Sequence, residues 1–187
     1  MAGKVNLEEM TWLCKPRLYL LDKDRIVIET EPFTDLRPAG MSAEAVELKL
    51  PARGSFCFRV KTPFVYRNVF DQCGLILYEG DRRKAIIFTQ RRDDETTRLQ
   101  CIVFHQERGD ISVRDIGSAI DTMLYRIWYR SGAVRIQYSF NTEKFSDLRE
   151  FWLDLEDDKE PGIGIFACSP ANSSFDCTFS EMVLEEE

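Results

Sequence analysis

The sequence contains little of what metal-based or nucleophilic chemistry requires. There is a single histidine, His105, and none of the six cysteines belongs to a CxxC pair, so the spacing predicts no metal site. No glycine-rich phosphate loop is present, and no serine lies in a nucleophile-elbow sequence. We therefore expect no metal, no cofactor and no serine-based catalytic triad.

A long apolar run, a leader sequence and an excess of basic residues are absent as well. No segment approaches the roughly 20 apolar residues that cross a bilayer. The N-terminus lacks the basic start and apolar run of a secretory signal. The formal net charge is −7, which disfavours binding to the phosphates of nucleic acid. These absences predict a cytoplasmic protein with reduced thiols that binds neither a membrane nor nucleic acid.

What the chain does contain is enough apolar material for one domain. It has 187 residues, 44% of them hydrophobic, and its 13 Phe, 6 Tyr and 3 Trp are typical of β-rich domains. This length fits one domain better than two. We expect a single domain over residues 1–187, with residues 1–11 and 185–187 at its periphery.

Alternation of side chains is the main structural signal. Between Thr122 and Arg130 every second residue is Met, Tyr or Ile, and after the Ser131-Gly132 turn the alternation resumes as far as Phe140. A period of two predicts strands with alternate side chains on opposite faces of a sheet. Short strands with turn signals about every 8–12 residues predict an all-β sandwich or barrel. The other expected strands cover 18–21, 25–29, 44–50, 55–60, 73–78, 84–89, 98–105, 111–114, 162–168 and 175–184.

Two segments are less regular. Residues 148–155 fit either a helix, which Ser146 would cap, or a strand. We favour the strand, because the segments on both sides are strands. Near the N-terminus, Asn6 is followed three residues later by Glu9, a spacing that resembles a capping box and predicts one or two turns of helix.

Four segments carry a resemblance to a known family: DQCGLILY at 71–78, YRIWYR at 125–130, the stretch 139–149, and GIGIFACSP at 162–170. In this order they resemble the concanavalin A-like domain family of unknown function that is labelled "regulation of enolase protein 1", over about residues 12–183. The resemblance implies a two-sheet, antiparallel jelly-roll sandwich of the concanavalin A-like lectin and glucanase type, with a concave face. It implies no settled catalytic activity.

The chain departs from the family's pattern at four aromatic positions. Leu36-Arg37 stands where the family commonly has Phe-Trp, and Arg82, Ile111 and Phe145 each stand where it has Trp. Sugar rings stack on exposed aromatic side chains. If the family's concave face binds a sugar, we therefore expect a reduced stacking platform in this chain.

The favoured hypothesis is a non-enzymatic binding module, whose ligand is a saccharide or a sugar-containing metabolite on the concave sheet. For Asp71 the alternative is a structural role, in which its carboxylate orders the loop 63–70. For Lys84 and His105 the alternative is ordinary solvation at a strand end. The candidate ligand-binding residues are Asp35, Arg37, Asp71, Gln72, Lys84 and His105.

Two other hypotheses stay open. The family's label suggests a protein-interaction or regulatory module that acts on a metabolic enzyme. Asp154, Glu156 and Asp158 alternate as carboxylates do in glycoside hydrolases of this fold, and they also fit a solvated acidic turn. Trp128 and Arg126 share one face of a strand and either stack against a ligand or cover the convex side.

Overall fold

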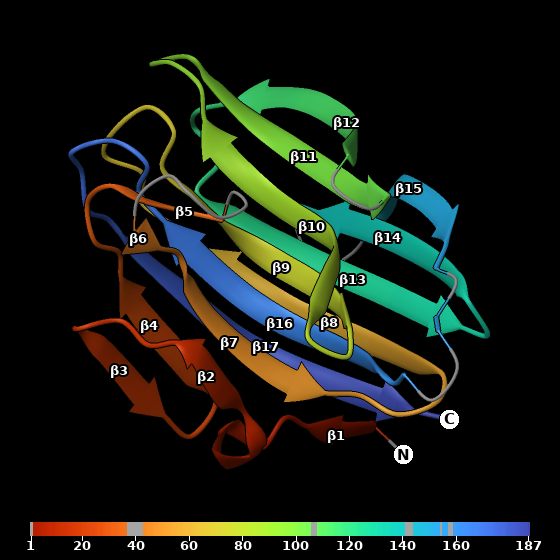
Figure 1. Cartoon of the computed structure of the whole chain (residues 1–187). Helices are drawn as coiled ribbons and strands as arrows, with labels where there is room; N and C mark the ends of the chain where they lie inside the picture. The colour runs from red at the N-terminus through yellow and green to blue at the C-terminus, as the bar shows by residue number, and fades with distance from the viewer. Residues whose placement is uncertain (1, 37–42, 106–107, 141–143, 154, 157–158) are drawn as a thin grey trace.

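The computed structural model describes residues 2–36, 43–105, 108–140, 144–153, 155–156 and 159–187. Two layers of antiparallel strands pack face to face, and both chain ends lie at the same end of the sandwich (Figure 1). We call the eight-stranded layer the back sheet and the seven-stranded layer the curved sheet.

The back sheet has the strand order β15-β14-β13-β8-β17-β4-β3, and β1 also pairs with β17. Its strands are β1 (Ala2–Lys4), β3 (Tyr19–Asp22), β4 (Arg25–Glu29), β8 (Phe56–Pro63), β13 (Thr122–Arg130), β14 (Ala133–Ser139), β15 (Ser146–Trp152) and β17 (Asp176–Glu186).

The curved sheet has the order β12-β11-β10-β9-β16-β7-β2. Its strands are β2 (Thr11–Cys14), β7 (Val46–Pro51), β9 (Gln72–Glu79), β10 (Arg82–Arg91), β11 (Thr96–His105), β12 (Arg108–Gly117) and β16 (Pro161–Cys168). A separate parallel pair consists of β5 (Thr34–Asp35) and β6 (Ala43–Glu44), and the 3-10 helix η1 covers Leu7–Glu9.

Alternation along the strands supplies the core between the two sheets. In β13 the inward side chains from Met123 to Tyr129 are buried, whereas Trp128 on the opposite face is 39% exposed. Burying one large apolar side chain contributes about 1.5–3 kcal/mol. A shift of one residue in register would expose the whole inward set, so burial fixes the register.

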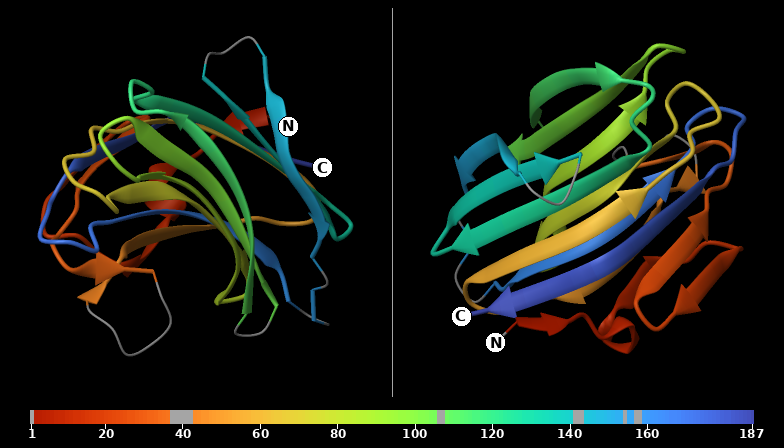
Figure 2. Two further views of the ribbon diagram at one scale, coloured as in Figure 1. Left: turned by 90° about the horizontal axis from the view of Figure 1, so that it is seen from above. Right: turned by 180° about the vertical axis from the view of Figure 1, so that it is seen from behind.

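The curved sheet is buried on both of its faces near the middle. All residues of β9 and β16 are buried, because the face turned away from the main core is concave. The β5–β6 pair and the β11–β12 hairpin lie on either side of this face (Figure 2). The residues of the second, smaller apolar cluster on it are Leu36, Ala45, Ile76, Tyr78, Ile86, Phe88, Phe166 and Cys168.

The predicted all-β sandwich is confirmed. The strand interpretation of the ambiguous segment is confirmed for residues 148–152, which belong to β15, whereas Leu153 and Leu155 lie beyond the end of that strand. The expected helical turn is η1. Asn6 caps it by accepting a hydrogen bond from the backbone N–H of Glu8 at 3.1 Å. The short strands β1, β2 and β5 are not expected from the sequence. No helix among the described residues has the length and apolar character to cross a bilayer.

Residues between 2 and 11 contribute to the core, in a segment that the sequence places at the periphery. Strand β1 pairs with β17, and the side chains of Val5, Leu7 and Met10 belong to the main apolar cluster. This N-terminal segment is ordered because its apolar side chains pack into one end of the sandwich. At the other end, Glu187 donates its backbone N–H to the carbonyl of Ser55 at 2.9 Å.

Candidate functional site on the concave face

Cross-strand register groups glutamine and apolar side chains on the concave face. Gln72 pairs directly with Gln90, and Phe88 pairs with Gln100. The next row contains Ile86, which pairs with Ile102. Directly paired residues point to the same side of a sheet, so the face carries glutamines beside phenylalanine and isoleucine.

A trough of about 330 Å³ opens between the β5 segment and β12. This volume lies within the range of about 300–1,000 Å³ that is usual for small-molecule sites. We call it the concave trough. Its polar lining is Asp35, Gln72, Gln90 and Gln100, and its apolar lining is Leu36, Ile86, Phe88, Ile102, Phe104 and Ile111.

The three glutamines form a continuous chain of hydrogen bonds. Gln100 Nε2 donates to Gln90 Oε1 at 3.2 Å, and Gln90 Nε2 donates to Gln72 Oε1 at 3.3 Å. Gln72 and Gln100 are only 6% and 9% exposed. In this chain Gln100 donates, Gln90 both accepts and donates, and Gln72 accepts, so the hydrogen bonds orient the three amides relative to one another. Fixed amides suit hydroxyl groups, which also donate and accept.

A partly buried ionic cluster supports the wall of the concave trough. Arg83 binds the Glu47 carboxylate through Nε at 3.1 Å and through Nη2, and its Nη1 donates to the carbonyl of Leu36 at 3.1 Å. The Tyr78 hydroxyl also donates to Glu47, at 2.7 Å. Burial and the Glu47 charge raise the pKa of the Tyr78 phenol, which stays protonated. The cluster therefore anchors the segment that carries Asp35 and Leu36.

Two of the six candidate ligand-binding residues, Asp35 and Gln72, lie in the concave trough. Asp35 Oδ1 accepts a hydrogen bond from the backbone N–H of Leu36 at 2.8 Å. Arg37 lies outside the described residues. The structure brings Asp35 and Gln72 together in one trough. That either side chain binds a ligand stays a prediction.

The surroundings of Asp71 favour its structural alternative. Its side chain is fully buried, and Oδ2 accepts hydrogen bonds from the backbone N–H groups of Arg67 at 2.9 Å and Asn68 at 2.8 Å. The hydroxyl of Ser173 donates to the same oxygen at 3.1 Å. The carboxylate thus orders the loop before β9.

Lys84 and His105 do not line the concave trough. Lys84 Nζ lies 2.7 Å from Glu79 Oε2, and the Glu79 carboxylate is 1% exposed. Burial alone would raise the pKa of Glu79, but hydrogen bonds from Lys84 and from the backbone N–H of Glu156 lower it. His105 ends β11 at an exposed position. Lys84 is therefore part of a buried ion pair, and His105 lies at the surface.

The carboxylate triplet suggested for a hydrolase is described only at Glu156. Asp154 and Asp158 lie outside the described residues. Glu156 forms an ion pair with Arg82 at 2.9 Å, and both side chains are more than half exposed. Glu156 therefore takes part in a surface ion pair, as expected if the segment is a solvated acidic turn.

The replaced aromatic positions fall in different places. Leu36 and Ile111 line the concave trough. At these two positions the trough therefore has aliphatic side chains where the family commonly has aromatic ones. Phe145 immediately precedes β15 of the back sheet, and the guanidinium of Arg126 lies 4.2 Å from its ring centroid. Among the described residues that line the trough, the aromatic side chains are Phe88 and Phe104.

Sequence reasoning missed Gln90, Gln100 and the two phenylalanines of the site. They occupy alternate positions of β10 and β11, and that period is visible in the sequence. What groups them with Gln72 is the register between strands, which the sequence does not display. Within the described ranges, no three His, Cys, Asp or Glu side chains gather as metal ligands.

The fold and this face define a class, the concanavalin A-like β-sandwich with an open concave trough. The chain belongs to the family described as "Protein of unknown function (DUF1349)", which matches residues 12–187. "Regulation of enolase protein 1" from Saccharomyces cerevisiae is 22% identical over 187 residues, covering 98% of this chain and 92% of the yeast protein. The resemblance seen in the sequence is thereby confirmed.

Solved structures of low sequence identity share the fold. The alginate lyase from Klebsiella pneumoniae superposes with a TM-score of 0.71 at 8% identity, over 98% of this chain and 97% of the lyase. A legume lectin-like domain from Entamoeba histolytica superposes with a TM-score of 0.61 at 12% identity, over 97% of this chain and 91% of that domain. Likeness at this identity shows a common architecture alone.

Proposed function

We propose that this protein is a single-domain, non-enzymatic binding module that holds a neutral saccharide in the concave trough. The observation that carries the proposal is the fixed chain of Gln72, Gln90 and Gln100 beside Phe88 and Phe104. Amides bond to hydroxyl groups, and the C–H faces of a sugar ring pack on phenyl and aliphatic side chains. The trough offers both kinds of contact.

The chemistry of the lining favours binding over hydrolysis. Asp35 is the one ionisable side chain among the described residues of the concave trough, whereas glycoside hydrolysis uses a pair of carboxyl groups. A neutral ligand fits a lining with so little charge. The names of the structural neighbours, an alginate lyase and a legume lectin-like domain, support a saccharide as the class of ligand.

We also propose that the protein works in the cytoplasm. All six cysteines are free thiols, which is usual in a reducing compartment. Burial raises the pKa of Cys57 to about 11 and that of Cys101 to about 12, so these thiols stay protonated and unreactive.

Isothermal titration calorimetry with cellotriose, maltotriose and mannotriose at millimolar concentrations tests the saccharide proposal. We expect saturable binding of at least one trisaccharide, weakened about tenfold by Gln100→Leu, because one hydrogen-bonded amide contributes about 1 kcal/mol or more. Gln137→Leu on the back sheet is the matched control and should bind normally. No saturable heat with any trisaccharide, or full binding by Gln100→Leu, would reject the proposal.

A regulatory module that acts on a metabolic enzyme is the second candidate. Strand β12 is an edge of the curved sheet and exposes Ile111 by 55% and Val113 by 49%. An exposed apolar edge strand is suited to pairing with a partner chain. The name of the yeast relative makes enolase the partner to test first.

Enolase from the same cell, assayed with rising amounts of this protein, tests that candidate. We expect a saturable change in enolase activity that Val113→Lys abolishes, since a charge in the centre of the edge opposes pairing. Unchanged enolase kinetics at a large excess of this protein would remove the candidate.

A further inference from the structure

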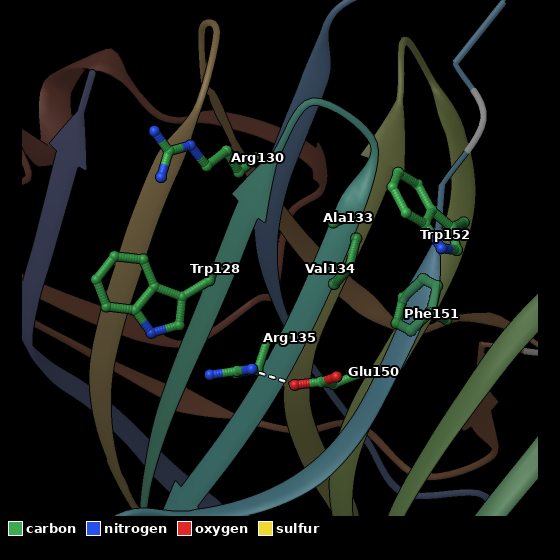
Figure 3. A pocket seen from close by; sticks show the side chains of 8 residues that line it. All are labelled: Trp128, Arg130, Ala133, Val134, Arg135, Glu150, Phe151 and Trp152. Atoms are coloured by element: carbon green, nitrogen blue, oxygen red, sulfur yellow. Dashed lines mark hydrogen bonds and ion pairs between the residues drawn. The ribbon is translucent and has the colours of Figure 1, made fainter.

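The outward face of the back sheet carries a second depression, on the opposite side of the sandwich from the concave trough. It encloses about 550 Å³. We call it the tryptophan slot. The side chains that decide its chemistry are Trp128, Arg130, Ala133, Arg135, Glu150 and Trp152 (Figure 3).

Register explains how three strands build the slot. Ala133 of β14 pairs with Arg130 of β13 and with Trp152 of β15. Because directly paired residues share a face, the small methyl group of Ala133 lies between two long side chains and leaves a hollow. The neighbouring row consists of Trp128, Arg135 and Glu150.

The two indoles stand on opposite sides of β14, and the Arg135–Glu150 ion pair closes one end of the slot (Figure 3). Trp152 is 71% exposed and Trp128 39%. These are large apolar surfaces to leave in water, and both border the same depression. Trp152 lies on the β15 side of it, and the Trp128 ring extends from β13 on the side away from β14 (Figure 3). The arrangement gives a ligand two aromatic surfaces and one polar end.

Each indole has a neighbour on the sheet that limits the space around it. Gly132, in the β13–β14 turn, has φ +88°, and a Cβ added there would lie 3.4 Å from Trp152 Cε3. The turn itself is tied to β15, since Leu153 donates its backbone N–H to the Gly132 carbonyl at 2.7 Å. On the other side, the Arg126 guanidinium lies 5.8 Å from the ring centroid of Trp128. Neighbours that restrict an aromatic side chain before binding reduce the entropy lost on binding.

Charge in the slot is balanced. Arg135 pairs with Glu150, and Arg130 lies 3.9 Å from Glu187. A cationic ligand would meet two guanidinium groups, and an anionic ligand would meet the two carboxylates. A neutral ligand with hydroxyl groups can bond to Arg135 and Glu150 together while its apolar face stacks on an indole.

We infer that the tryptophan slot is a second saccharide site, which binds a neutral pyranose by stacking on Trp152 or Trp128 and by hydroxyl contacts to Arg135 and Glu150. The inference goes beyond the proposed function, because it uses no residue of the concave trough. A chain with both sites holds one saccharide on each side of the sandwich.

Tryptophan fluorescence tests the slot directly. In a Trp12→Phe background the fluorophores are Trp128 and Trp152, and stacking of a sugar ring changes their emission. Titration with cellotriose, maltotriose and mannotriose at millimolar concentrations should give a saturable change for at least one of them. Trp152→Ala and Ala133→Leu should each raise the dissociation constant about tenfold or more, the first by removing a stacking surface and the second by filling the hollow.

The controls separate the slot from the concave trough. Gln100→Leu in the same background should leave the fluorescence response unchanged, whatever its effect on the calorimetric binding at the trough. The slot is rejected if no trisaccharide changes the emission, if Ala133→Leu binds normally, or if Gln100→Leu abolishes the response. It is also rejected if a proline decamer gives the saturable change and the trisaccharides do not, since that result marks a peptide-docking surface. Because Ala133 and Trp152 are exposed, both variants should keep the wild-type circular dichroism.

Discussion

The outward faces of the two sheets follow the same alternating pattern and have opposite characters. On the concave face Ile86 and Phe88 are 6% and 4% exposed, whereas on the back sheet Trp152 is 71% exposed. The difference comes from the curvature of the curved sheet and from the β5 segment that covers part of it. Arg83 anchors this segment by donating a hydrogen bond to the Leu36 carbonyl. Alternation therefore decides which side chains share a face, and the surrounding elements decide how much of that face is covered.

Steric tolerance should differ most between the two faces. A Cβ at Gly74 on the concave face would lie 2.0 Å from the Ile87 carbonyl oxygen and 2.6 Å from Phe88 Cα. We expect Gly74→Ala to lower the free energy of unfolding by about 3 kcal/mol or more. Ala133→Val on the exposed strand β14 should change it by less than about 0.5 kcal/mol. Urea unfolding of both variants measures the contrast, and similar losses for the two would mean that the concave face is not tightly packed.

Ion pairs in the interior should contribute more to the free energy of unfolding than ion pairs at the surface. Lys84→Met leaves the buried Glu79 carboxylate without its cation, and we expect a loss of about 2–3 kcal/mol, somewhat below the usual cost for a fully buried pair. Urea unfolding near neutral pH measures it. A loss within error of zero would show that Glu79 is solvated in solution.

The same pair predicts a pH dependence. The folded pKa of Glu79 is lowered from its ordinary value of 4.5, so its contribution to stability is fully present above that value. The contribution is lost as the pH falls through the folded pKa. The difference in unfolding free energy between wild type and Glu79→Gln should therefore shrink on acidification below about pH 4.5. A constant difference across that range would contradict the assignment.

The loop before β9 should depend on the carboxylate of Asp71. Asp71→Ala removes the acceptor for two backbone N–H groups, and we expect a loss of about 2 kcal/mol. Hydrogen exchange should become faster at Arg67 and Asn68, whose amides bind Asp71 Oδ2. Asp71→Asn, which keeps one acceptor, should retain part of the protection. Unchanged exchange at both amides in Asp71→Ala would reject the structural role.

The smallest effect is expected at the back sheet. Arg135 and Glu150 are each more than half exposed, so Arg135→Ala should cost less than about 1 kcal/mol. Thermal unfolding of this variant beside Lys84→Met compares the two pairs. A larger loss of stability for Arg135→Ala than for Lys84→Met would contradict the greater contribution expected of the buried pair.

The strands were predictable because alternation is a local property of the sequence. The family resemblance is enough to predict that Asp35 and Gln72 lie on the concave face. Gln90 and Gln100 were not predicted there, since their hydrogen bonds to Gln72 depend on the pairing of β9, β10 and β11. The tryptophan slot shows the same limit: Trp128 stands out in the sequence, but only register brings Trp152 and Ala133 to it. Long-range pairing is set by packing of the whole sandwich, which no short segment encodes.

Amide chemical-shift mapping by NMR, during titration with the trisaccharide that binds most tightly in calorimetry, tests the central claim about the concave trough most directly. We expect saturable shifts centred on the side-chain and backbone amides of Gln72, Gln90 and Gln100, with the same dissociation constant as the calorimetric titration. The absence of shifts at these three residues under saturating ligand would contradict the account.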